Sequence, residues 1–203
     1  MSPVHRLSTM GSFGTNKIDY PSMLASYGDY GALQRITSQI LASDSSGSVA
    51  LTNIPATYQD LMLVIYGRDT SANTSITGGI YLNTISTSNW SSTQMRGDGS
   101  SATSGRTTTS SPTYGGGFVV PAASATANIF GSVVIHILNY ASTTVNKTVL
   151  ARSAADLNGS GLVELRASLW ASTAAVNRID IASSANWRAG TYFGLYGVKA
   201  SAA

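Results

Sequence analysis

The sequence predicts an all-β protein, an antiparallel β-sandwich of the jelly-roll type with an extended N-terminal arm. Charged residues make up only 10% of the 203 residues, with a single Glu and three Lys, whereas surface helices normally carry many Glu and Lys residues. Short apolar segments of strand length recur from residue 33 onward, and clusters of Gly, Ser, Asn and Asp separate them. No long helical period interrupts this pattern, so strands joined by turns are expected.

The length suits one domain with an arm, and we assign residues 1–32 to the arm and residues 33–203 to the β-sandwich. Gly and Pro interrupt any period in the arm, although a disordered tail would normally be poor in aromatic residues. Two interpretations stay open: the arm becomes ordered on another protein, or it covers the core of its own chain. In the first case its large apolar residues form the attachment site: Phe13, Ile18, Tyr20, Met23, Leu24, Tyr27 and Tyr30.

In the first half of the domain, one apolar run and one Ser/Thr-rich segment carry most of the information. The continuous run Leu61–Tyr66 predicts a central strand covered on both faces. Residues 84–113 include seventeen Ser or Thr and predict a long loop excursion anchored by Trp90. Further strands are expected at residues 34–41, 48–54, 79–83 and, as a short edge strand, 118–121, with a turn over residues 73–79.

The block from Ala127 to Lys199 has the clearest strand patterns and is expected to supply most of the core. Its strands are expected at residues 129–138, 147–152, 162–170, 176–182 and 192–198. In the third of these, alternation places two sets of side chains on opposite faces. One set is Val163, Leu165, Ala167 and Leu169, and the other is Glu164, Arg166 and Ser168.

Charge and composition argue against several classes of function. The arginines are spread almost evenly along the chain, whereas a nucleic-acid-binding protein normally has a clustered basic stripe. The absence of Cys excludes disulfides and thiolate metal sites. No apolar run reaches the ~18 residues of a membrane span. The start, Met1–Arg6, lacks the apolar segment of a secretory signal, so we expect synthesis in a cytoplasm.

Catalytic groups are sparse. The two histidines, His5 and His136, stand alone, and His136 lies in an apolar run where a core or interface residue is expected. We expect neither a metal nor a cofactor. Glycosidases need paired carboxylates, and the best available pair, Asp156 and Glu164, flanks the Asn158–Gly161 turn. We expect both to be solvated hairpin residues, and the protein not to be an enzyme.

Two features leave an adhesive role open. The tripeptide Arg96-Gly-Asp98 matches a motif read by adhesion receptors, although chance explains it better in a Ser/Gly-rich segment. Sugar-binding sites place aromatic faces beside polar groups, which makes Trp90 and Tyr114 candidate glycan contacts. Buried aromatic anchors are nevertheless the more common role of Trp and Tyr.

Several segments occur in an order that can be compared with a known group of proteins: Asn53–Ile65, Ile135–Ala141, Asn158–Gly161 followed by Glu164–Trp170, Ala174–Ile181 and Gly194–Lys199. This order resembles small virion proteins of tailed bacteriophages over roughly residues 33–199. The resemblance implies a non-enzymatic structural protein on the particle exterior, either a capsid decoration (cement) protein or a fibre component. It implies other virion proteins of the capsid or tail as partners, a homotrimer, and no catalytic residues. For a fibre component, a host-surface glycan is the alternative partner.

Overall fold

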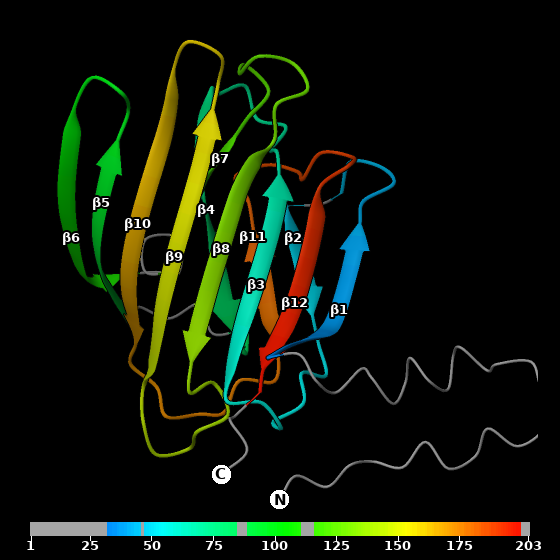
Figure 1. Ribbon diagram of the computed structural model, residues 1–203, viewed down its shortest axis with the longest axis vertical. Coiled ribbons are helices and arrows are strands. Elements are labelled where there is room, and N and C mark those ends of the chain that lie inside the picture. Colours follow the sequence, from blue (N-terminus) through cyan, green and yellow to red (C-terminus); the bar gives the residue numbers. More distant parts are fainter. Residues whose placement is uncertain (1–31, 46, 85–88, 111–115, 200–203) are drawn as a thin grey trace, which may run out of the picture. The chain divides into compact units, whose positions relative to one another are not determined.

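The computed structural model describes residues 32–45, 47–84, 89–110 and 116–199. These residues form twelve strands and no helix, in two antiparallel sheets that pack face to face (Figure 1). The all-β prediction is therefore confirmed. The seven arm residues proposed for attachment and Tyr114 lie outside the described residues.

The large sheet has eight strands in the order β1, β12, β3, β8, β9, β10, β5, β6, and the small sheet has four in the order β2, β11, β4, β7. The strands of the large sheet are β1 Leu33–Ile40, β3 Asp60–Gly67, β5 Trp90–Gly97, β6 Ala102–Ser110, β8 Gly131–Leu138, β9 Lys147–Asp156, β10 Gly161–Trp170 and β12 Tyr192–Val198. Those of the small sheet are β2 Ser48–Leu51, β4 Ser75–Leu82, β7 Phe118–Pro121 and β11 Ile179–Ala182.

The main core lies between the two sheets. Alternate residues of β3 and β8, such as Leu63 and Ile135, are fully buried against residues of the small sheet such as Ile80 and Ile181. This burial follows the period of two that strands impose on their side chains. Of the thirty buried hydrophobic residues in the described ranges, fifteen come from residues 127–199 and fifteen from earlier in the chain. The C-terminal block thus supplies half of the core, not most of it.

The predicted loop over residues 84–113 is instead the β5–β6 hairpin wherever the structure describes it. Threonine favours strands, and β5 pairs with β10 along its whole length. The turn is closed by Asp98, whose Oδ1 accepts hydrogen bonds from the backbone amides of Ser100 and Ser101 at 2.9 and 2.7 Å. The predicted anchor is confirmed, because Trp90 is only 1% exposed and its ring lies 6.4 Å from that of Trp170.

One other local prediction is wrong, and a second is confirmed in part. The turn expected over residues 73–79 is largely strand, since β4 begins at Ser75. The run Leu61–Tyr66 is a central strand, as predicted, because β3 lies between β12 and β8. The described residues cover only one of its faces: Leu61, Leu63 and Ile65 are buried, but Tyr66 is exposed and its alternate neighbours are half-buried.

The small sheet covers only part of the large one. Its edge strand β7 contacts β9, β8 and, to a lesser extent, β10. In Figure 1, β5 and β6 extend past the strands that lie behind β8, β3 and β12. We call β3, β8 and β9 the covered half of the large sheet, and β10, β5 and β6 the wing. The face of the large sheet toward the small sheet is its inner face, and the opposite one is its outer face.

Candidate functional site: the outer face of the large sheet

Strand β10 has the reverse of the usual sandwich pattern. Its polar residues Glu164, Arg166 and Ser168 are buried on the inner face. Its apolar residues Val163, Leu165 and Leu169 are exposed on the outer face. A sandwich strand normally turns its apolar side inward, so this strand places a charge cluster inside the molecule and an apolar surface outside.

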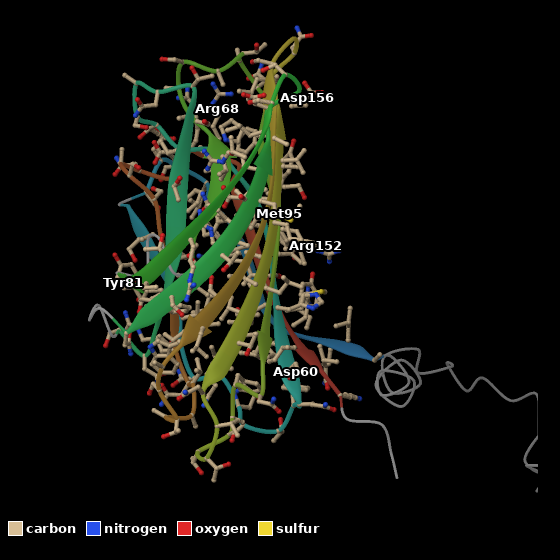
Figure 2. All side chains as sticks on the ribbon, turned by 90° about the vertical axis from the view of Figure 1, so that its left-hand side faces the viewer. Asp60, Arg68, Tyr81, Met95, Arg152 and Asp156 are labelled. Atoms are coloured by element: carbon tan, nitrogen blue, oxygen red, sulfur yellow. The ribbon has the colours of Figure 1, made fainter. Side chains whose placement is uncertain are left out.

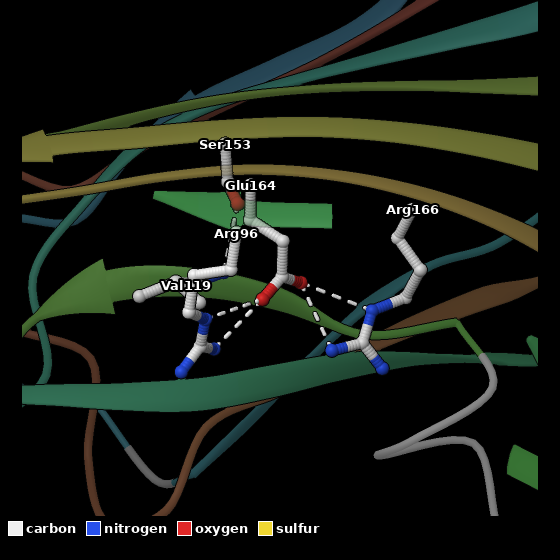
Figure 3. Close-up of polar contacts among 5 residues, drawn as sticks. All are labelled: Arg96, Val119, Ser153, Glu164 and Arg166. Carbon is white, nitrogen blue, oxygen red and sulfur yellow. Dashed lines mark hydrogen bonds and ion pairs between the residues drawn. The ribbon is translucent and has the colours of Figure 1, made fainter. Parts of the chain in front are cut away.

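The charge cluster is an ion-pair triad around Glu164 (Figure 3). Oε2 of Glu164 accepts hydrogen bonds from Nε and NH2 of Arg96 at 2.9 and 2.7 Å. Oε1 accepts from Nε of Arg166 at 3.0 Å, and the NH2 group of Arg166 lies 2.9 Å away. Glu164 and Arg166 are only 2% and 3% exposed. Charges so far from water are tolerated only when they are paired and hydrogen-bonded.

The triad connects neighbouring parts of the inner face. Arg96 lies on β5 directly opposite Glu164 on β10, so the ion pair joins the two strands beyond their backbone ladder. Close by, the backbone amide of Val119 on β7 donates to Oγ of Ser153 on β9 at 3.1 Å, which links the two sheets (Figure 3). These contacts stabilise the junction between the covered half and the wing.

The carboxylate pair considered for glycoside hydrolysis is not brought together. Asp156 is exposed on the outer face at the end of β9, whereas Glu164 is buried on the inner face of β10. Both oxygens of Glu164 accept hydrogen bonds from guanidinium groups, so this carboxylate is not placed to donate a proton to a leaving group. The expectation of two solvated hairpin residues is therefore correct for Asp156 and wrong for Glu164.

The outer face of the large sheet is apolar over most of its width. Figure 2 views the sheet edge-on and places Met95 and Arg152 on this side, opposite Tyr81 of the small sheet. Val163 and Met95 are 65% and 64% exposed, and Leu165 is 42% exposed. Among the described residues, strand register places eight of the nine exposed large hydrophobic residues on this face: Leu33, Ile40, Tyr66, Met95, Leu150, Val163, Leu165 and Leu169.

Strand register aligns these residues into rows across the sheet. In one row Met95 on β5, Leu165 on β10 and Arg152 on β9 lie side by side, followed by Val134 on β8 and Val64 on β3. The next row contains Thr93, Ala167, Leu150, His136 and Met62 on the same five strands. His136 thus lies half-buried among apolar neighbours on the outer face and not in the core between the sheets.

The two ends of the wing differ on this face. The exposed apolar side chains of Val163, Leu165 and Met95, which we call the ridge, lie toward the turns at residues 98–101 and 157–160, where Val163 also borders a cleft between those turns. At the other end a hollow of about 380 Å³ is lined chiefly by small side chains and the Arg106 stem. The outer-face residues of the hollow are Ser91, Thr93, Arg106, Thr148, Ala167 and Leu169.

A separate cleft of about 850 Å³ lies between the β5–β6 and β9–β10 turns. We call it the polar cleft after Asp98 and Asp156 in its lining, although Gly, Ala, Leu162 and Val163 supply more of the surface. Hydrogen bonds from the amides of Ser101 and Ser100 hold the pKa of Asp98 below its ordinary value of 3.8. The Arg96-Gly-Asp98 tripeptide therefore has two structural roles: Arg96 pairs with Glu164 and Asp98 closes the turn.

The proposed glycan contacts do not form a sugar platform in the part of the chain that the structure describes. The ring of Trp90 lies in the core, so its face is not accessible for stacking. Tyr114 lies outside the described residues. No aromatic residue lines the polar cleft.

Neither a metal cluster nor a membrane helix is found within the described ranges. They contain no group of three or more His, Asp or Glu residues able to hold an ion. None of their elements is a helix long and apolar enough to cross a membrane.

Lys147 is fully buried, and its Nζ donates to three backbone carbonyls, those of Ser142, Val145 and Thr173. Burial lowers the pKa of this lysine. This lysine stabilises two loops at the end of the sheet.

Sequence reasoning missed the outer face as a candidate site. The alternation in β10 was visible, and it separated the apolar from the polar set correctly. Nothing in the alternation itself says which set faces inward.

Comparison with known proteins yields no match to a family model, a curated protein or a solved structure.

Proposed function

We propose that the protein is a non-enzymatic structural component of a bacteriophage virion, displayed on the particle exterior. In this proposal the domain is a jelly-roll type sandwich that works as an oligomeric capsid decoration protein or a short fibre component. The arm, residues 1–32, attaches it to capsid or tail proteins. The observation that carries the proposal is the exposed apolar outer face of the large sheet.

Burial of apolar area is the main driving force of protein association, at about 25 cal/mol per Å² before the costs of ordering. A soluble monomer rarely exposes a contiguous apolar patch above a few hundred Å². The outer face combines exposed Met95, Val163 and Leu165 with half-buried residues of β8 and β3. Such a surface favours a protein that works in an assembly.

The phage context comes from the sequence resemblance over residues 33–199, and the arm adds a second contact. A domain that binds through both its arm and its sheet face gains affinity by linking two weak contacts. Synthesis in a host cytoplasm followed by assembly onto the particle fits this arrangement.

The test uses particles assembled without the protein. Labelled full-length protein is added, and bound protein is measured by co-sedimentation and located by electron microscopy. We expect binding at regular exterior positions and its loss when Tyr20 and Leu24 are changed to Asp or residues 1–32 are deleted. Ser26→Asp, a polar change within the same segment, is the control. Undiminished binding by the deleted protein would overturn the role of the arm, and absence of binding by the full-length protein would overturn the proposed function.

A tail-fibre adhesin that binds host-surface glycans is the second candidate, and the polar cleft is the feature that favours it. Its carboxylates and serines, Asp98, Asp156, Ser100 and Ser160, are groups that hydrogen-bond sugar hydroxyls. A glycan array probed with the full chain and with Asp156→Ala is the test. Binding that disappears with this exposed carboxylate would support the adhesin, and an array without signal would oppose it.

A further inference from the structure

We propose that the outer face of the large sheet is covered by the large sheet of a second copy of this chain. A two-fold axis relates the copies; it lies between the two facing large sheets and runs perpendicular to their strands. This inference rests on the proposed function in one respect, that the outer face is a contact surface. It adds the identity of the partner, a second copy of the chain, and the register in which the two sheets face each other. A rotation of this kind reverses strand direction, so that each strand packs over its own counterpart.

The first support is the shape of the wing. The ridge of Val163, Leu165 and Met95 and the hollow beside Ala167 occupy opposite ends of the same two strands, β10 and β5. Reversing the strand direction therefore places the ridge of each copy over the hollow of the other. A cavity of roughly 150 Å³ accommodates one benzene ring, so a hollow of about 380 Å³ can receive two apolar side chains.

The second support is area. Six neighbouring strands of about eight residues, spaced ~4.8 Å apart with a rise of ~3.3 Å per residue, present about 760 Å² of sheet per copy. A protein interface of standard size takes roughly 600–1,000 Å² from each partner. The outer face is therefore large enough for a two-fold dimer, and facing sheets pack within about 30° of alignment in known sandwiches.

The third support is the composition of β3. Its continuous apolar run is typical of a strand covered on both faces, yet the described residues of one chain cover only its inner face. A second copy over the outer face would cover Met62 and Val64. The same layer would shield Leu150 and His136 in the neighbouring strands.

Charge separates a second copy from other partners. Arg152 lies within the apolar rows, and no described residue forms an ion pair with it. In the two-fold arrangement Arg152 lies over Leu150 of the second copy and near its Arg152, so that removing the charge should favour association. An acidic partner would instead depend on Arg152.

The experiment measures the mass of the full chain by sedimentation over a range of concentrations. We expect dimers, and we expect Leu165→Glu and Ala167→Lys each to weaken dimerisation by at least about 100-fold. Mixing these two variants should restore dimers, because the axis pairs position 165 of one copy with position 167 of the other. Val145→Glu, an exposed apolar site in the loop between β8 and β9, is the control and should dimerise normally. Arg152→Leu should dimerise at least as tightly as the unchanged chain.

Each other outcome overturns the proposal. A monomeric full chain means that another occupant, such as the segment 1–31 or a different protein, covers the face. A trimer, the state implied by the family resemblance, excludes the two-fold axis. If neither variant weakens the dimer, the dimer interface lies elsewhere on the protein. If mixing the two variants does not restore dimers, the proposed register is refuted. These results are independent of particle binding, so a monomer that still binds particles leaves the proposed function standing.

Discussion

The covered half and the wing of the large sheet differ in what they bury. In the covered half, Leu63, Ile135 and Val149 point toward the small sheet and are fully buried. In the wing, Glu164 and Arg166 occupy the inner face, with Trp170 buried at the end of β10, whereas Val163, Leu165 and Leu169 lie outside. The change occurs between β9 and β10, the outermost large-sheet strand that β7 contacts.

This difference shows how the reach of the second sheet decides the orientation of side chains. Where a covering apolar layer is present, apolar residues are most stable inside. At the limit of that layer, apolar side chains on the inner face would have few packing partners. The charged groups of the ion-pair triad, in contrast, form hydrogen bonds with one another and do not need that layer. Val163, Leu165 and Leu169 of β10 are then left on the outer face, where they stabilise the protein only if another surface covers them.

Among changes that test this difference between the two regions, Glu164→Ala is expected to lower the free energy of unfolding the most. The change removes the carboxylate that balances the buried charge of Arg166, and breaking a buried pair in this way costs about 3–5 kcal/mol of unfolding free energy. Urea unfolding measures it. Asp156→Ala removes an exposed carboxylate at the turn of the same hairpin, which accepts one hydrogen bond from the amide of Asn158, and should cost no more than about 1 kcal/mol. Equal effects of the two changes would contradict the structural role of the triad.

A smaller effect is expected from alanine at two inner-face glycines. A Cβ at Gly131 in the covered half would lie 2.6 Å from Cδ of Pro121, a ring that cannot move aside easily. Overpacking of this kind costs about 1–3 kcal/mol. At Gly105 in the wing, the nearest atom is 3.3 Å away at the end of the flexible Gln94 side chain. Gly105→Ala should therefore be neutral within about 0.5 kcal/mol.

Thermal unfolding of both glycine variants provides the measurement. A destabilised Gly105→Ala protein with an unaffected Gly131→Ala protein would reverse the order and show that the wing is the more tightly packed region.

The smallest effect is expected from the pH dependence of the wing turn. The folded-state pKa of Asp98 is below its ordinary value of 3.8 because backbone amides of Ser101 and Ser100 donate to the carboxylate. Its contribution to stability is therefore present above about pH 4 and is lost as the pH falls through the folded-state pKa. In Asp98→Asn, unfolding measured between pH 5 and pH 2 should depend less on pH than in the unchanged chain. Identical pH profiles would show that the carboxylate does not stabilise the turn.

Much of the fold follows from sequence patterns, and the exceptions have physical causes. The strand over residues 192–198 was predicted with its observed bounds, because apolar periodicity and turn residues define it locally. The β5–β6 hairpin was missed because Ser and Thr are common in both loops and strands, and its stability comes from pairing with β10. The burial of Glu164 depends on Arg96, 68 residues away in sequence.

The sequence by itself determined that this chain forms an antiparallel β-domain, where most strands lie, and that Glu164 and Leu165 occupy opposite faces of one strand. These properties depend on local periodicity and turn chemistry. Only the tertiary structure decided which of those faces is inside, since burial depends on how far the small sheet extends over the large one. For the same physical reason, the apolar outer face, the candidate contact surface of this protein, was recognisable only once both sheets were in place.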